Sequence, residues 1–156
     1  MRVETGLGVV HLFFTRGERV DRDAVTAAIG RAESAGCQVV TAAILGHKAD
    51  IAVMALGADL RALRDLQTGL TAAGLHLSDS YVSITEVSEY AKGLPEHMLQ
   101  ARLYPELPTE GKQAFCFYPM SKRRGPDANW FTLDHDRRKE LMLEHGASGR
   151  KFAGRV

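Results

Sequence analysis

The sequence lacks the features that identify disulfide-rich, thiolate-metal and membrane proteins. It contains two cysteines, Cys37 and Cys116, and no Cys-x-x-Cys pair, so neither a disulfide framework nor a thiolate zinc site is expected. No apolar run reaches the length of about 18 residues that a transmembrane helix needs. The first residues also lack the charged-then-apolar pattern of a secretory signal. We therefore expect a cytoplasmic protein without a membrane span.

The motifs of several large enzyme classes are missing too. There is no G-x-S-x-G motif and no P-loop, and the Gly6-Leu7-Gly8 sequence lacks the third glycine of a dinucleotide fingerprint. Residues 37–45 and 49–56, both expected to be strands, contain no aromatic side chain on which an RNA base could stack. Hydrolase, kinase and nicotinamide chemistry are therefore excluded, and nucleic-acid binding is disfavoured.

The composition is that of a folded globular chain with an unevenly distributed charge. Of 156 residues, 45% are hydrophobic and 25% are charged, and the formal net charge is +1. Residues 1–119 carry 11 Lys and Arg against 14 Asp and Glu, whereas residues 120–156 carry 9 against 5. The basic C-terminal part would attract an anion, which could be nucleic acid, phosphate or a polycarboxylate.

Hydrophobic periodicity predicts six elements in the order β-α-β-β-α-β over residues 4–89. This order is that of a ferredoxin-like split βαβ unit, which makes the fold class α+β and residues 1–89 an N-terminal ferredoxin-like repeat. The expected strands are 6–15, 37–45, 49–56 and 80–87, and the expected helices are 21–35 and 59–73.

The rest of the chain predicts a connector and the start of a second, incomplete ferredoxin-like repeat. Residues 90–112 hold three of the five prolines, with a short helix expected at 96–102. Residues 113–156 predict a strand at 113–118, a loop and a helix from about Asp134. A full repeat would need about 45 further residues. We therefore expect either a fragment or a chain whose second repeat is completed by a partner.

Several segments carry a resemblance to a known family. They are FYPMSKRR, NWF, RRKELMLEHG and GRKFAGRV in the last forty residues, and SYVSITEVSEY and ARLYPELP further upstream. The sequence resembles the chlorite dismutase family and, within it, the branch of coproheme decarboxylases. The resemblance extends over most of residues 40–156.

The resemblance implies a fold, an assembly and a reaction. Members of that family have the dimeric α+β barrel fold, in which each subunit contains two ferredoxin-like repeats. Subunits commonly form homopentamers, and the porphyrin lies in the C-terminal repeat. The decarboxylase branch uses hydrogen peroxide to convert iron-coproporphyrin III (coproheme) to haem b, the last step of a haem biosynthesis route. Two propionates become vinyl groups and carbon dioxide is released.

By position in the matched motifs, the resemblance implies roles for two residues at the centre of this chemistry. His145, in the EHG of the last predicted helix, would be the proximal ligand of the iron. Tyr118, in the YPMSK motif, would form the radical that attacks a propionate.

Four further residues would bind the porphyrin. Lys122 and Arg102 would contact propionates, Met120 would line the pocket, and Trp130 would pack near the porphyrin on its proximal side. Cations suit a ligand that carries four propionates. The other histidines are expected to be structural or exposed; they are His11, His47, His76, His97 and His135.

One family feature falls beyond the matched segments. The distal residue, glutamine in one lineage and arginine in chlorite dismutases, follows the GRKFAGRV motif in the relatives. Alternatives therefore stay open, namely a non-catalytic haem- or porphyrin-binding relative, a truncated subunit, or a haem enzyme of the chlorite dismutase or peroxidase type.

Overall fold

The computed structural model describes residues 1–91 and 93–152. Lys92 of the predicted connector and the last four residues of the GRKFAGRV motif lie outside the described residues. The elements are β1 (Gly8–Arg16), α1 (Arg22–Ser34), β2 (Gln38–Ala43), β3 (Ile51–Gly57), α2 (Leu60–Ala72), β4 (Leu75–Ile84), η1 (Glu89–Ala91), α3 (Glu96–Leu103), η2 (Trp130–Thr132) and α4 (His135–Arg150).

Two compact units make up the chain. The first comprises residues 1–87 and 93–115, and the second comprises residues 88–92 and 116–156. Segment 88–92, which follows β4 in the sequence, thus belongs with the C-terminal part. The predicted division at 1–89, 90–112 and 113–156 stays a prediction about repeats.

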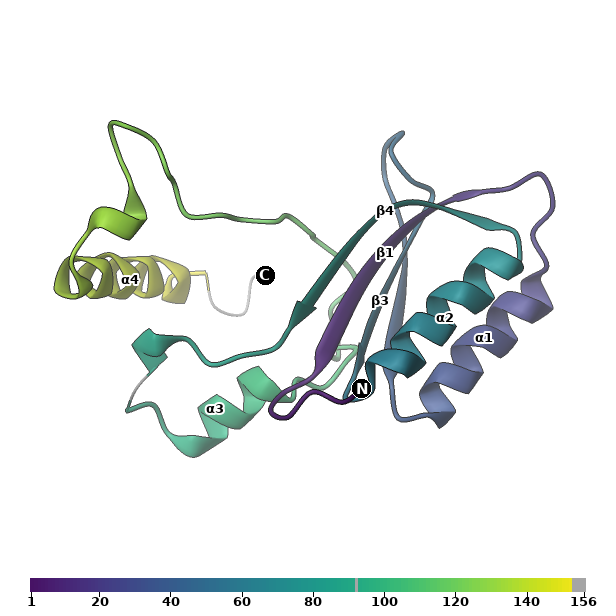
Figure 1. Cartoon of the computed structure of the whole chain (residues 1–156), viewed down its shortest axis with the longest axis horizontal. Coiled ribbons are helices and arrows are strands. Elements are labelled where there is room, and N and C mark those ends of the chain that lie inside the picture. Colours follow the sequence, from purple (N-terminus) through teal and green to yellow (C-terminus); the bar gives the residue numbers. More distant parts are fainter. Residues whose placement is uncertain (92, 153–156) are drawn as a thin grey trace. The chain divides into compact units, whose positions relative to one another are not determined.

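The first unit contains a four-stranded antiparallel sheet with the strand order β2-β3-β1-β4. β1 lies in the centre, where Val10 is opposite Ala55 of β3 on one side and Val82 of β4 on the other. α1 and α2 lie side by side along one face of this sheet (Figure 1). The predicted ferredoxin-like order and the α+β class are confirmed.

The core of the first unit lies between the sheet and these two helices. Alternate residues of β1 point to the helices, as the period of two in a strand requires. Leucines spaced along α2 meet them, because side chains three and four residues apart share a helix face. The largest fully buried side chains are Phe14, Leu12, Leu63, Leu66, Leu70, Leu75 and Val53.

Local signals set the helix boundaries close to the predicted ones. Asp21 caps α1 and Asp59 caps α2, each accepting a hydrogen bond from a backbone N–H in the first turn. After α2 the chain reverses at Gly74, whose φ is +96°, and a Cβ there would lie 2.1 Å from the carbonyl oxygen of Arg19. Only glycine fits this position.

Two strand predictions differ from the structure. β4 begins at Leu75 rather than Ser80. A bulge opposite Phe13 and Phe14 leaves Ser78 without a paired residue in β1, and this extra residue interrupts the alternation of polar and apolar side chains from which the strand was predicted. The strand predicted at 113–118 is absent, and these residues are unassigned in the structure. A strand needs a neighbour to pair its backbone groups, and no described strand is paired with this segment.

Side chains attach the connector after α3 to the four-stranded sheet. The Gln38 carboxamide donates to the carbonyl oxygen of Pro105 at 2.9 Å and accepts from the Leu107 N–H at 2.6 Å. The Thr85 hydroxyl donates to the carbonyl oxygen of Leu103 at 2.7 Å. These contacts hold the connector along the sheet in place of strand pairing.

No described helix combines the length and the apolar character needed to cross a bilayer.

Candidate functional site

α4 presents a line of chemically distinct side chains in the second unit. Asp134 caps the helix by accepting from the Arg137 N–H at 2.8 Å. Arg138, Met142 and His145 follow at spacings of four and three residues, which places them along one side of the helix. His145 is exposed there.

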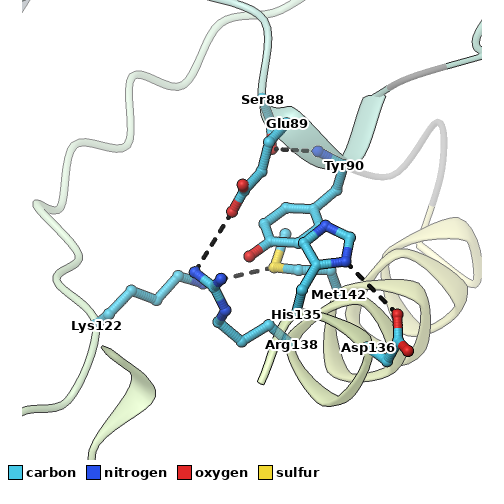
Figure 2. Close-up of polar contacts among 8 residues, drawn as sticks. All are labelled: Ser88, Glu89, Tyr90, Lys122, His135, Asp136, Arg138 and Met142. Atoms are coloured by element: carbon cyan, nitrogen blue, oxygen red, sulfur yellow. Dashed lines mark hydrogen bonds and ion pairs between the residues drawn. The ribbon is translucent and has the colours of Figure 1, made fainter. Parts of the chain in front are cut away.

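Lys122 lies against this side of α4. Its ammonium nitrogen is 4.2 Å from the centre of the Trp130 ring and donates to the Met142 sulfur at 3.5 Å. Figure 2 shows Lys122, from the segment before η2, among the α4 side chains. A cation over an indole face is attracted by about 0.5–1 kcal/mol at an exposed site. The structure thus brings together two of the predicted binding residues, Lys122 and Trp130.

The local sequence explains the position of Trp130. Its backbone N–H donates to the carbonyl oxygen of Arg123 at 2.9 Å, which closes the loop between the basic run and η2. The Asn129 side chain caps η2 by accepting from the Phe131 N–H at 3.0 Å. The Gly-Pro-Asp-Ala-Asn loop is therefore the turn that places the indole beside Lys122.

Tyr118 and Met120 precede Lys122 in the same segment of the second unit. Tyr118 is 68% exposed and Met120 is 76% exposed, so the phenol and the thioether are both accessible to a ligand. The adjacent cations Arg123 and Arg124 are exposed as well. This unit therefore carries the predicted catalytic phenol and a group of cations within one short stretch.

Arg102, the remaining predicted residue, belongs to the first unit. It lies in the last turn of α3, where its guanidinium donates to the Met98 carbonyl oxygen of the same helix at 2.6 Å. The guanidinium is exposed and is not engaged by a carboxylate among the described residues.

A second cluster of side chains was not predicted from the sequence. It lies where η1 packs against α4, next to the Lys122 side chain. The Glu89 carboxylate pairs with Arg138 at 3.5 Å, and the Tyr90 ring stacks on His135 with ring centres 5.8 Å apart. The Tyr90 ring also meets Trp130 edge-on at 6.4 Å. Glu89 and Tyr90 belong to the SEY end of the SYVSITEVSEY segment, which carries part of the family resemblance. That resemblance was the only sequence signal for this cluster.

The phenol of Tyr90 is perturbed by its surroundings. The hydroxyl is shielded from solvent and makes no hydrogen bond of ordinary geometry to a described residue. The Glu89 carboxylate nevertheless raises the pKa of Tyr90, because it interacts with the neutral phenol as an acceptor, and burial adds to this. The hydroxyl therefore stays protonated over the physiological range.

A ferredoxin-like sheet unit is joined in one chain to a unit with an exposed helical histidine, an indole and a lysine, and this combination defines the chain as an α+β protein. The chain belongs to the chlorite dismutase family, whose sequence profile matches residues 19–156.

Three similar proteins illustrate the relationship. A protein of Natronomonas pharaonis, provisionally named as heme-binding, is 44% identical over 130 residues, covering 72% of this chain and 21% of the relative. The coproheme decarboxylase of Staphylococcus carnosus is 39% identical over 125 residues, covering 72% of this chain and 49% of the enzyme. The chain thus spans about a fifth and about half of these two relatives.

A solved structure agrees with the fold. The structure of a heme-binding protein from Thermus thermophilus superposes with a TM-score of 0.75 at 29% sequence identity, covering 96% of this chain and 68% of that one.

The residues of the second unit fit an iron porphyrin. Across residues 1–91 and 93–152, no three His, Cys, Asp or Glu side chains gather to hold a metal ion. An iron porphyrin brings four nitrogen ligands of its own, and the exposed imidazole of His145 would supply a ligand from the protein. Lys122 would pair with a propionate, and Trp130 and Met142 would provide apolar contact.

Proposed function

We propose that this protein takes part in the peroxide-dependent oxidative decarboxylation of iron-coproporphyrin III to haem b. The observation that supports this most directly is the 39% identity to a coproheme decarboxylase over 125 residues. The match to the family profile, over residues 19–156, includes Tyr118, Lys122 and His145. A cytoplasmic homo-oligomer, a pentamer by family resemblance, is part of the same proposal.

The chain's own residues would divide the work. His145 would hold the iron from one side through a neutral imidazole, and Lys122 and Arg102 would pair with propionates and so orient the ring. Met120 and Trp130 would contact the porphyrin. The Tyr118 phenol would lose its hydroxyl proton and one electron, and would then remove a hydrogen atom from a propionate side chain.

The iron porphyrin, when bound, supplies the redox chemistry with peroxide. For each propionate, one hydrogen peroxide and one proton are consumed, and one vinyl group, one carbon dioxide and two waters are formed. Two rounds convert coproheme to haem b. The electrons that leave the propionate reduce the peroxide, so no further reductant is needed.

A titration tests the proposal. Purified chain is titrated with iron-coproporphyrin III, hydrogen peroxide is added stepwise, and the Soret band and product masses are followed. We expect stepwise loss of two carboxyl groups, abolished by Tyr118→Phe and by His145→Ala. Tyr81→Phe, on the exposed edge strand β4, and His47→Ala, in an exposed loop, are the matched controls and are expected to behave as wild type.

A second function is porphyrin binding without catalysis. It is supported by the 44% identity to a protein provisionally named as heme-binding. In that case the porphyrin binds through His145 without loss of mass, and Tyr118→Phe changes nothing. Failure to bind any porphyrin would contradict both functions.

A further inference from the structure

α4 carries the proposed iron ligand but has no buried residue of its own. A helix without an apolar face is not oriented by a core, so its rotation depends on a few specific contacts. The half-buried residues of α4 mark the side where these contacts occur. They are Arg138, Leu141, Met142 and Gly146.

The charged contact on this side joins α4 to η1. Arg138 Nη1 lies 3.5 Å from Glu89 Oε1, and the Arg138 side chain is 25% exposed while that of Glu89 is 54% exposed. The Nε atom of Arg138 is shielded from solvent without a hydrogen-bond partner among the described residues. A partly desolvated guanidinium depends on its carboxylate partner more than a surface pair does.

The aromatic contact fixes the same region from the neighbouring residue. The Tyr90 ring is nearly parallel to the His135 imidazole, at 22°, and nearly perpendicular to the Trp130 indole, at 81°. Figure 2 shows Tyr90, His135 and Arg138 gathered between η1 and α4. Such ring pairs contribute direction as well as contact area, because their quadrupoles favour particular angles.

His145 lies on the same side of the helix as this contact. Arg138 and His145 are seven positions apart, and two turns of an α-helix take about 7.2 residues, so the two side chains are nearly aligned. A small rotation of α4 at Arg138 would therefore turn the imidazole of His145 by the same angle.

We propose that Glu89, Tyr90 and Arg138 are positioning residues that set the orientation of α4 and thereby of the His145 imidazole. The inference rests on the proposed role of His145 as the iron ligand. According to this proposal, the SEY segment, which follows β4 in the sequence, sets the orientation of the iron ligand on α4.

Reversal of the ion pair tests the proposal. Glu89→Arg and Arg138→Glu each place like charges together, and the double variant restores an opposite pair. With ferric haem b and iron-coproporphyrin III as probes, we measure the dissociation constant, the Soret maximum and the ferric/ferrous midpoint potential. Each single variant is expected to weaken binding by about 2- to 30-fold and to shift the Soret band, and the double variant to recover most of both.

A second pair of variants tests the ring. Tyr90→Ala removes the stack on His135 and is expected to shift the Soret band, whereas Tyr90→Phe keeps the ring and the wild-type spectrum. Circular dichroism on every variant identifies any that fail to fold, and Tyr90→Phe and the double charge variant keep the test open if one does.

The His145→Ala background separates positioning from general stability. If the three residues act through the imidazole, their variants change porphyrin binding no further once His145 is absent. The inference would be overturned if the variants weaken porphyrin binding equally in the wild-type and His145→Ala backgrounds, or if they weaken it in neither background. Wild-type binding through His145 without decarboxylation would contradict the proposed reaction and leave the positioning role intact. Wild-type binding that does not depend on His145 would overturn the positioning role.

Discussion

Cys37 and Cys116 differ in their surroundings, and this difference has a chemical consequence. Cys37 is buried in the core of the first unit, and burial together with the charge of Asp59 raises the pKa of its thiol. Cys116 is exposed. Since the thiolate is the reactive form, a buried thiol with a raised pKa reacts slowly.

A maleimide is therefore expected to modify Cys116 and to leave Cys37 untouched until the chain unfolds. Peptide mass spectrometry over a time course at about pH 8 checks this. Cys116→Ser is the control and is expected to show no modification of the native protein. Equal labelling rates for the two thiols would contradict the burial of Cys37.

Asp59 links the N-cap of α2 to the pH dependence of stability. Its Oδ1 atom accepts from the Arg61 N–H at 3.0 Å, and this hydrogen bond is the main reason that the pKa of Asp59 is lowered. A carboxyl whose pKa is lower in the folded state stabilises the fold above its unfolded pKa. The contribution is lost as the pH falls through the folded pKa.

Asp59→Ala is thus expected to lower the melting temperature at neutral pH, with the gap to wild type narrowing on acidification. Asp59→Asn keeps a capping oxygen without the charge and is expected to show a smaller gap. Melting temperatures across the acidic range provide the measurement. A gap that stays constant with pH would show that the ionised carboxylate is not responsible.

At the scale of elements, Gln38 replaces strand pairing for the connector. Its carboxamide bonds both Pro105 and Leu107, which lie far away in the sequence. A primary amide can do this because it presents a donor and an acceptor side by side, as a backbone peptide does.

Gln38→Ala is expected to lower the free energy of unfolding by about 1–3 kcal/mol, the range for two hydrogen bonds of ordinary net strength. Hydrogen exchange at the Leu107 amide should accelerate, while amides of the central strand β1 keep their protection. Gln113→Ala, at an exposed position just after the connector, is the control and is expected to change neither quantity. Unchanged exchange at Leu107 would contradict the clamp.

At the scale of the whole molecule, the two units differ in how much they bury. The core side chains belong to the first unit, mostly to its sheet, α1 and α2, whereas Ala91 is the one buried residue among the described residues of the second. Local opening requires less free energy where few apolar contacts must be broken. The second unit should therefore open first.

Limited digestion with trypsin is expected to cut first within Lys122 to Arg124, before any cut in α1 or α2. Bound iron-coproporphyrin III should slow these cuts, since a ligand stabilises the form that binds it. The masses of the fragments over time give the order. Arg31 and Arg64, exposed on α1 and α2, are internal controls, and early cleavage after either would contradict the prediction.

The sequence by itself determined the first unit and the family. Alternation in β1, leucine spacing in α2 and capping aspartates before both helices are local signals, and each specifies its element without distant contacts. The motifs of the last forty residues, together with SYVSITEVSEY and ARLYPELP further upstream, indicated the chlorite dismutase family, which the family profile confirms. The assignment of individual site residues stays a prediction.

Only the tertiary structure decided which residues meet. The bulge at Ser78, the clamp made by Gln38 and the packing of Glu89 and Tyr90 on α4 all join positions distant in the chain. The strand predicted at 113–118 was wrong for the same reason, because pairing depends on a neighbour that the local pattern does not specify. Periodicity reports which side of an element is apolar, whereas the partner of that side is set by the packing of the whole chain.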